Sequence, residues 1–147
     1  MSKLPSDAQR VAESFEGLMA ALLKQKRGEP EGEPPTLSAF QALALAQLAD
    51  RGPVRLGVLA DALGTTDATA SRTVDVLESR GLAERRPDPA DARGVFVAAT
   101  REGAAELRRR RRRLAKLAER ALADLSPDET RRVADALDEL RTLLDRR

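Results

Sequence analysis

The 147-residue chain contains no cysteine and no histidine. These absences exclude disulfides, thiol redox sensing, cysteine nucleophiles, histidine general bases and ordinary zinc sites. Tryptophan and tyrosine are also missing, so an aromatic-lined ligand pocket would rest on three phenylalanines. The motifs GxSxG and SxxK and a glycine-rich phosphate loop are absent too. The sequence therefore predicts a protein that is not an enzyme, with no catalytic residue, metal site or cofactor.

Long apolar runs are lacking as well. No stretch approaches the ~20 uninterrupted apolar residues that a membrane-spanning helix needs. The N-terminal segment MSKLPSDAQR has no apolar core of the kind found in signal peptides. We therefore expect a cytoplasmic protein without membrane contact, whose length suits one domain with a modest core.

Neither sign of charge dominates, since the formal net charge is +2, but the charges are unevenly distributed. Residues 1–53 and residues 54–100 each have a balance of −1, whereas residues 101–147 have a balance of +4. Much of that excess is a run of six arginines at positions 108–113. A basic region is typical of nucleic-acid-binding proteins, although it does not identify one.

Helical patterns cover most of the chain. The periodicity and the start and stop signals predict helices over residues 7–26, 36–50, 58–64, 67–80, 100–125 and 126–147. The second of these is apolar on most sides, so we expect it to be central to the core. Ser126, Pro127 and Glu129 form a capping box at the start of the last one.

The centre of the chain is the most informative part. Two short helices are joined by the turn LGTT and followed by the extended segments LAERR and GVFVAAT, with the polar hairpin tip PDPADARG between them. This order predicts a winged helix-turn-helix. Ala60 allows the two helices to cross closely and Gly64 supplies the turn. Val74 and Leu77 return the second helix to the core.

A helix held in this way can lie in the DNA major groove with its N-terminal residues against base edges. Arg72 suits a bidentate contact with guanine, and threonine methyl groups suit thymine. Asp67 suits the helix dipole and could accept from cytosine N4, but it is unfavourable beside phosphates. The candidate base-contacting residues are Thr66, Asp67, Ala68, Thr69, Arg72 and Thr73. A merely solvated helix face is the alternative interpretation.

The segment VLADALG…ATREG, residues 58–103, resembles the winged-helix core of the MarR family of bacterial transcriptional regulators. The wing carries most of the resemblance: Asp91 lies two residues before Arg93, and GVFVAAT and REG follow. The similarity extends over about residues 36–104. It implies a mostly α (α+β) fold in one compact domain. A winged helix-turn-helix core at residues 36–100 would be flanked by dimerisation helices within residues 1–35 and 101–147.

The resemblance also implies roles for the wing residues. In that family the wing arginine enters the minor groove and the neighbouring acid holds its side chain. Carried over, Arg93 reads the minor groove and Asp91 orients it. Arg85 and Arg86 are candidate phosphate contacts, but alternation along a strand lets only one face DNA, and Arg86 is assigned. For Arg93, a solvated hairpin tip is the alternative.

The terminal helices are expected to form a homodimer, because a single winged domain does not need them and because the resemblance implies it. The apolar seams expected to join the partners are Val11, Phe15, Leu18, Leu22, Val133, Leu137, Leu140 and Leu144. A two-fold dimer would place its recognition helices about 34–36 Å apart on a pseudo-palindromic operator.

The arginine run lies within a predicted helix, because the apolar stripe from Leu107 to Leu125 continues through it. Glu106 is spaced to pair with Arg109 or Arg110. Three interpretations of the run remain open. It could be a solvated helix face, it could attract DNA at long range, or it could form a site for an anion or effector. That site would lie between the dimer helices and the winged helix-turn-helix of each chain, which is called the head below.

The sequence thus predicts a homodimeric winged-helix regulator, most simply a repressor, that binds double-stranded DNA. A small anionic or phenolic effector, which the resemblance implies, would shift the population between DNA-competent and incompetent dimers. The alternative is a winged-helix module that binds another protein. An enzyme acting on nucleic acid would need a cluster of metal-binding carboxylates, and none stands out in the sequence.

Overall fold

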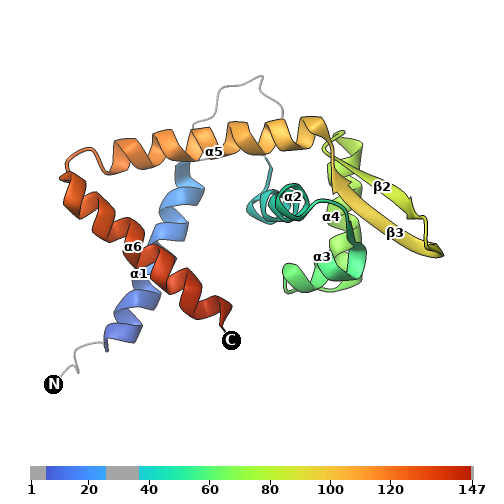
Figure 1. The fold of residues 1–147 in the computed structure, drawn as a ribbon. Helices are drawn as coiled ribbons and strands as arrows, with labels where there is room; N and C mark the ends of the chain where they lie inside the picture. Colours follow the sequence, from blue (N-terminus) through green and yellow to red (C-terminus); the bar gives the residue numbers. More distant parts are fainter. Residues whose placement is uncertain (1–5, 26–36, 147) are drawn as a thin grey trace. The chain divides into compact units, whose positions relative to one another are not determined.

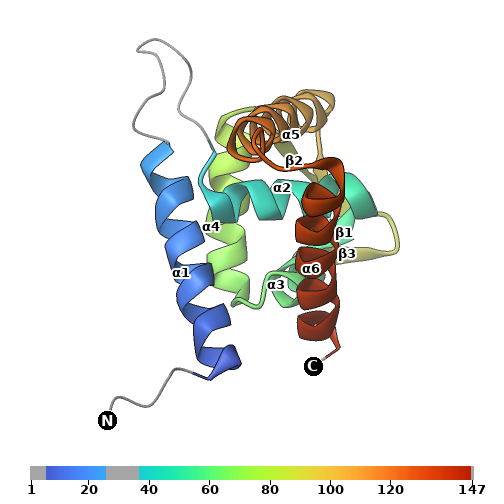
Figure 2. The ribbon, with the colours of Figure 1, turned by 90° about the vertical axis from the view of Figure 1, so that its left-hand side faces the viewer.

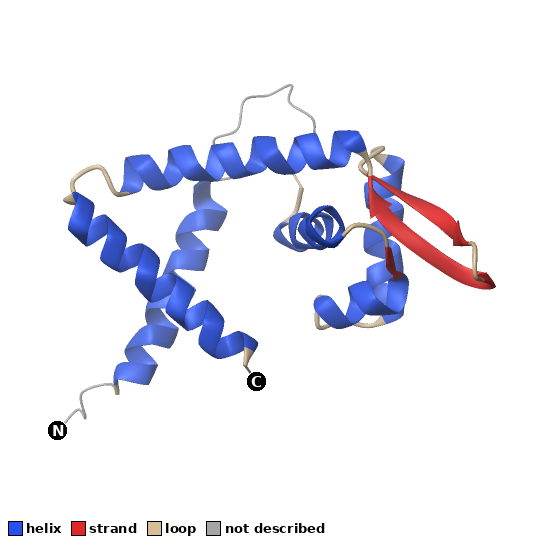
Figure 3. Cartoon of the chain, viewed as in Figure 1, coloured by secondary structure: helices blue, strands red, loops and turns tan. Residues whose placement is uncertain are grey.

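The computed structural model describes residues 6–25 and 37–146, except for the side chains of residues 22, 23 and 25. The chain divides into two units, Met1–Leu37 and Ser38–Arg147. The first contains α1 (Asp7–Gln25). The second contains α2 (Ala39–Arg51), β1 (Val54–Arg55), α3 (Leu56–Ala62), α4 (Asp67–Ser79), β2 (Ala83–Asp88), β3 (Asp91–Ala99), α5 (Arg101–Ala121) and α6 (Pro127–Asp145), shown in Figure 1 and Figure 3. This order confirms the predicted mostly helical, winged helix-turn-helix fold.

Side-chain hydroxyl groups lie at the start of five helices. At α1, Ser6 Oγ accepts from the Gln9 backbone N–H at 3.2 Å. Ser38, Thr66, Thr100 and Ser126 are the N-caps of α2, α4, α5 and α6, and each accepts a hydrogen bond from a backbone N–H in the first turn. These bonds satisfy donors that the helix itself leaves unpaired. The predicted capping box is confirmed, since the Ser126 backbone N–H donates to Glu129 Oε2 at 2.8 Å.

The helix-turn-helix is built by α3 and α4. Ala60 is buried where the two helices pack, and Gly64 adopts a φ of 60° in the turn between them. That left-handed conformation favours glycine because it has no Cβ. Val74 and Leu77 are fully buried on the inner face of α4. Gly81, with a φ of 70°, ends the helix, as the sequence predicted.

Within residues 38–147, α2 is the central helix. Figure 1 and Figure 2 both place it between α5 and α3. Ala44, Leu45 and Leu48 are buried on it, whereas Leu43 points to solvent with 57% of its surface exposed. The central position is confirmed, and one large apolar residue of the helix, Leu43, remains uncovered.

The sheet is antiparallel with the order β1-β3-β2. The sequence did not predict β1, whose two residues pair with the base of β3, Val54 opposite Val97 and Arg55 opposite Phe96. The hairpin strands also run further than predicted. Only residues 89 and 90 form the tip, and the pairing shifts register between Pro87 and Asp88. The hairpin projects beyond the helices in Figure 1.

The helix α5 is shorter than predicted and only its first half is covered. It ends at Ala121, so Leu125 lies in the turn that follows. Leu107 is buried against the core, whereas Leu114 and Leu125 are exposed. No helix in the described parts of the chain is long and apolar enough to cross a membrane.

Candidate nucleic-acid interface

The buried face of α4 determines which of its side chains can reach a ligand. Ala70, Val74 and Leu77 are fully buried and fix the rotation of the helix about its axis. Their spacing leaves the opposite face to solvent. Asp67, Ala68 and Arg72 are exposed there. The side chain of Arg72 makes no hydrogen bond or ion pair with any residue that the structure describes, so its guanidinium is available to a partner.

Two threonines at the start of α4 are partly used by the fold. Thr66 Oγ1 accepts from the Thr69 backbone N–H at 3.3 Å and donates to Thr69 Oγ1 at 3.1 Å. Thr66 is exposed and Thr69 is half-buried. Their hydroxyl groups therefore define the helix start.

The prediction that Thr73 contacts bases needs correction. Thr73 is buried, with 8% of its surface exposed, and its Oγ1 donates to the Thr69 carbonyl oxygen at 2.9 Å. It lies three residues after Ala70 and four before Leu77, on the face that packs against the core. That spacing was visible in the sequence and is the signal that would have excluded Thr73.

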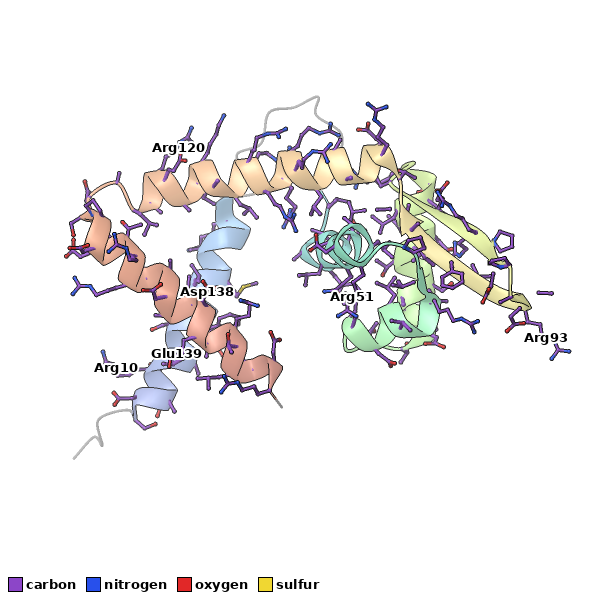
Figure 4. All side chains as sticks on the ribbon, viewed as in Figure 1. Arg10, Arg51, Arg93, Arg120, Asp138 and Glu139 are labelled. Carbon is purple, nitrogen blue, oxygen red and sulfur yellow. The ribbon has the colours of Figure 1, made fainter. Side chains whose placement is uncertain are left out.

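The wing presents Arg93 at its tip. Figure 4 shows this side chain extending away from the strands, and the residue is exposed. Asp91 contacts the backbone of Arg93, since its Oδ1 accepts from the Arg93 backbone N–H at 3.0 Å, and its predicted role in orienting the arginine side chain stays a prediction. Among the described residues no acceptor holds the Arg93 guanidinium. Asp91 thus shapes the chain at the tip and leaves the arginine side chain uncommitted.

Arg85 and Arg86 point to different surroundings, as alternation along β2 requires. Arg85 turns toward α4, where it pairs with Glu78, lies 2.7 Å from Asp75 Oδ1 and donates to the Ser71 carbonyl oxygen at 3.2 Å. Partial burial of the guanidinium tends to lower the pKa of Arg85. Hydrogen bonds to Asp75 and Glu78 outweigh this effect, so the pKa of Arg85 is raised. Arg85 therefore joins the wing to the recognition helix and is not available to phosphates.

Arg86 is exposed and lies on the other face of β2. Its Nε donates to Glu84 Oε1 at 2.8 Å, and both side chains are solvent-accessible. An exposed pair of this kind is weak, so Arg86 can exchange Glu84 for a phosphate at little cost.

A cluster that the sequence did not reveal surrounds Arg55 on β1. Its Nη2 donates to Asp88 Oδ2, and its Nη1 lies 3.9 Å from Asp91 Oδ2. The Arg55 guanidinium carbon also lies 5.8 Å from the centre of the Phe96 ring. The partners are more than thirty residues away along the chain, so no local pattern pointed to them.

Acidic partners tether several members of the arginine run. Glu106 pairs with Arg109 at 2.9 Å and with Arg113 at 3.1 Å, and Arg111 lies 3.3 Å from Asp50 of α2. Partial burial tends to raise the pKa of the Glu106 carboxyl. The hydrogen bonds from Arg109 and Arg113 outweigh this effect, so the pKa is lowered. The predicted pairing of Glu106 with Arg109 is confirmed.

The run lies away from the start of the recognition helix. The first turn of α5 packs against the backbone of Leu82, which follows the C-terminal end of α4. The 13 residues of α4 span about 20 Å, so its N-terminal end is that far from this contact. Long-range attraction of DNA by the arginine run and an anion site at the run both remain predictions.

The predicted dimer seams are exposed in the single chain. On α1, Val11, Phe15 and Leu18 are each about half exposed, and the side chain of Leu22 lies outside the described residues. On α6 none of the described residues is buried. Its seam consists of Val133, Leu137, Leu140 and Leu144, of which Leu140 is half-buried and the others are exposed. Three or more acidic side chains placed to hold a metal ion are not found among the described residues.

Comparison with known proteins gives consistent matches. The model of the MarR family matches residues 34–94. The repressor NicR of Pseudomonas putida is 38% identical over 73 residues, which is 50% of this chain but only 46% of NicR. FabT of Streptococcus pneumoniae, solved in complex with DNA, has a TM-score of 0.72 at 21% identity and covers 95% of this chain and 98% of its own. The FabT match shows a shared fold.

The match to one relative extends over the whole chain. Mb0904 of Mycobacterium bovis, an HTH-type transcriptional regulator, is 34% identical over 143 residues, or 97% of each protein. Its similarity includes the terminal helices, which the family model does not cover. Together with the family match and the winged helix-turn-helix, it shows that this chain belongs to the MarR family of transcriptional regulators.

Proposed function

We propose that the protein is a homodimeric repressor that binds a pseudo-palindromic operator, with α4 in the major groove and the β2–β3 tip in the adjacent minor groove. One observation carries this proposal: a single folded unit presents two uncommitted arginines, Arg72 on α4 and Arg93 on the wing. Arg85 ties the two elements together through Glu78 and Asp75.

In the major groove Arg72 is the residue that specifies sequence. Its exposed guanidinium suits the O6 and N7 acceptors of guanine, which it can reach with two hydrogen bonds. Ala68, one turn earlier, suits a thymine methyl group. Asp67 disfavours close phosphates and can accept only from a donor such as cytosine N4. One head alone therefore binds DNA with modest affinity but selectively.

In the minor groove Arg93 supplies the charge. An arginine inserted there responds to groove width, because a narrow A·T-rich groove is more electronegative. The absence of a described acidic partner for its guanidinium supports this role. The FabT structure supports it at the level of the fold, since that winged helix was solved with DNA bound.

Dimerisation supplies the second head. The seams of α1 and α6 expose large apolar side chains, and a second copy would remove them from water. Two-fold symmetry would then match the two halves of the operator. A small anionic or phenolic effector would act by favouring a dimer whose heads are misplaced for that spacing. A regulator of this kind acts on chromosomal DNA, so we place it in the cytoplasm.

The proposal is tested by binding of the full chain to a duplex selected by the protein from a random pool. Arg72→Ala and Arg93→Ala should each weaken binding by roughly five- to a hundredfold, the range for an arginine that contacts bases. Arg120→Ala removes the same charge from an exposed position of α5 outside the arginine run and should change binding little. If both test variants bind every duplex as the parent does, DNA recognition is excluded and a protein-binding module becomes the better account.

A further inference from the structure

The wing is attached to the helix-turn-helix at a second place besides Arg85. Arg55 lies on β1 at the N-cap position of α3, and its guanidinium donates to the carboxylate of Asp88 near the tip of the hairpin. The side chain of Asp88 is only 3% exposed, whereas that of Arg55 is half exposed. A carboxylate so deeply buried requires a compensating partner, and Arg55 is its cationic one.

The surroundings of Asp88 are fitted to this contact. The Ala90 backbone N–H donates to Asp88 Oδ1 at 2.8 Å, which closes the turn at the tip. Gly94 lies on the neighbouring strand β3, and a Cβ added to it would lie 3.0 Å from both Cβ and Oδ2 of Asp88. A side chain at position 94 would therefore push Asp88 away from Arg55, and glycine leaves the space open.

A second acid connects Arg55 to the predicted DNA contact. Asp91 Oδ2 lies 3.9 Å from Arg55 Nη1, and the other oxygen of the same carboxylate accepts from the backbone N–H of Arg93. The two carboxylates thus link β1 to both sides of the tip. Phe96 lies beneath the guanidinium and restricts its orientation.

We propose that Arg55 is a positioning residue for minor-groove recognition: through Asp88 and Asp91 it holds the tip at the angle that brings Arg93 to the groove. This inference rests on the proposed DNA binding. The competing account of a half-exposed arginine at this place is a direct contact with a phosphate. The two accounts make opposite predictions for the partner Asp88.

The variant Asp88→Asn separates them by the direction of its effect. It adds one positive charge to the protein and releases Arg55, so a direct phosphate contact would leave binding unchanged or make it tighter. If Arg55 positions the tip, the same variant binds the selected duplex roughly tenfold more weakly, although the protein is more basic. Salt concentration is held constant throughout.

A double-mutant cycle identifies the residue through which Arg55 acts. Arg55→Met should weaken binding of the parent by roughly tenfold but should cost little further when Arg93 is already alanine. With Arg72→Ala its effect should be additive, because Arg72 lies on the other element. Hydroxyl-radical footprinting should show loss of minor-groove protection next to each half-site, with the rest of the footprint retained.

Two controls show whether the variants are folded: far-UV circular dichroism and the double variant Arg55→Met/Asp88→Asn. That variant keeps the net charge and leaves no buried carboxylate unpaired, and it should bind as weakly as Arg55→Met. Additivity of Arg55→Met with Arg93→Ala, or binding by Asp88→Asn at least as tight as the parent, overturns the inference while DNA binding stands. A parent protein that selects no duplex overturns the proposed function itself.

Discussion

At the scale of single residues, Arg85 shows how one side chain determines the relation between two elements. Its guanidinium and its backbone N–H both bind Glu78 of α4, so strand and helix are joined at a common point. The sequence placed Arg85 among the candidate phosphate contacts because it lies just before the wing. The acid that it binds lies seven residues earlier in a different element, the helix α4, so neither strand nor helix periodicity relates the two positions.

Replacing Arg85 should destabilise the fold. Arg85→Met leaves Glu78 without its cation in a partly buried position, and we expect a loss of about 1–3 kcal/mol in the free energy of unfolding. Urea denaturation measures it. Arg86→Met is the matched control, since its exposed pair with Glu84 should contribute less than about 1 kcal/mol. Equal losses in both variants would contradict the structural role of Arg85.

Gly103 has a packing role that the sequence motif REG did not reveal. It is buried in the first turn of α5, and a Cβ there would overlap the carbonyl oxygen of Leu82. Gly103→Ala should therefore destabilise the protein by roughly 1–3 kcal/mol despite the better helix propensity of alanine. Gly17 in α1 has open space at its Cβ. Gly17→Ala should be neutral or slightly stabilising, and thermal unfolding compares the two.

At the scale of elements, local signals predicted the helix starts well and the strands poorly. Ser126 caps α6 as expected, and Thr66 caps α4 in the same way, because a capping bond depends only on residues within one turn. The two residues of β1 became a strand only because β3 lies beside them. The ends of β2 and β3 likewise depend on their mutual pairing. Such contacts are set by the tertiary fold.

The acid–base pairs of α5 should make stability depend on pH. The folded protein holds the pKa of Glu106 below its ordinary value of about 4.5, so the folded state binds fewer protons than the unfolded chain. Its contribution is present above pH 4.5 and is lost as pH falls through the lower, folded-state pKa. Glu106→Gln should cost on the order of 1 kcal/mol at pH 7 and progressively less below pH 4.5.

Urea denaturation at several pH values tests this, with Glu119→Gln as the control. Glu119 is exposed on the same helix, and its replacement should change stability little at any pH. A loss for Glu106→Gln that stays constant down to pH 3 would show that the effect is packing rather than charge.

At the scale of the whole molecule, the exposed seam of α6 should govern assembly. Leu137→Asp places a charge in the middle of this seam, where 53% of the leucine is exposed in the single chain. We expect the dissociation constant of the dimer to rise at least tenfold, because burying an unpaired carboxylate at an interface is unfavourable. Binding to a full operator should weaken as well, since one head is lost.

Sedimentation velocity measures the change in assembly. Arg131→Asp is the control, because residue 131 is exposed and lies on the side of α6 away from all four seam residues by helical geometry, so it should leave the dimer intact. If Leu137→Asp sediments as the parent does at the same concentration, the seam is not the interface and α6 covers another part of the chain.

Arg85 and Arg55 bind the hairpin at two places, Arg85 by its pair with Glu78 of α4 and Arg55 by its pair with Asp88 near the tip. If these contacts keep the winged helix-turn-helix rigid, it offers a regulator no hinge of its own. Whatever turns operator binding off must then rotate or displace two stiff bodies relative to each other. Sequence changes that alter the response to a signal, while sparing recognition of a single half-site, should accordingly gather in the terminal helices.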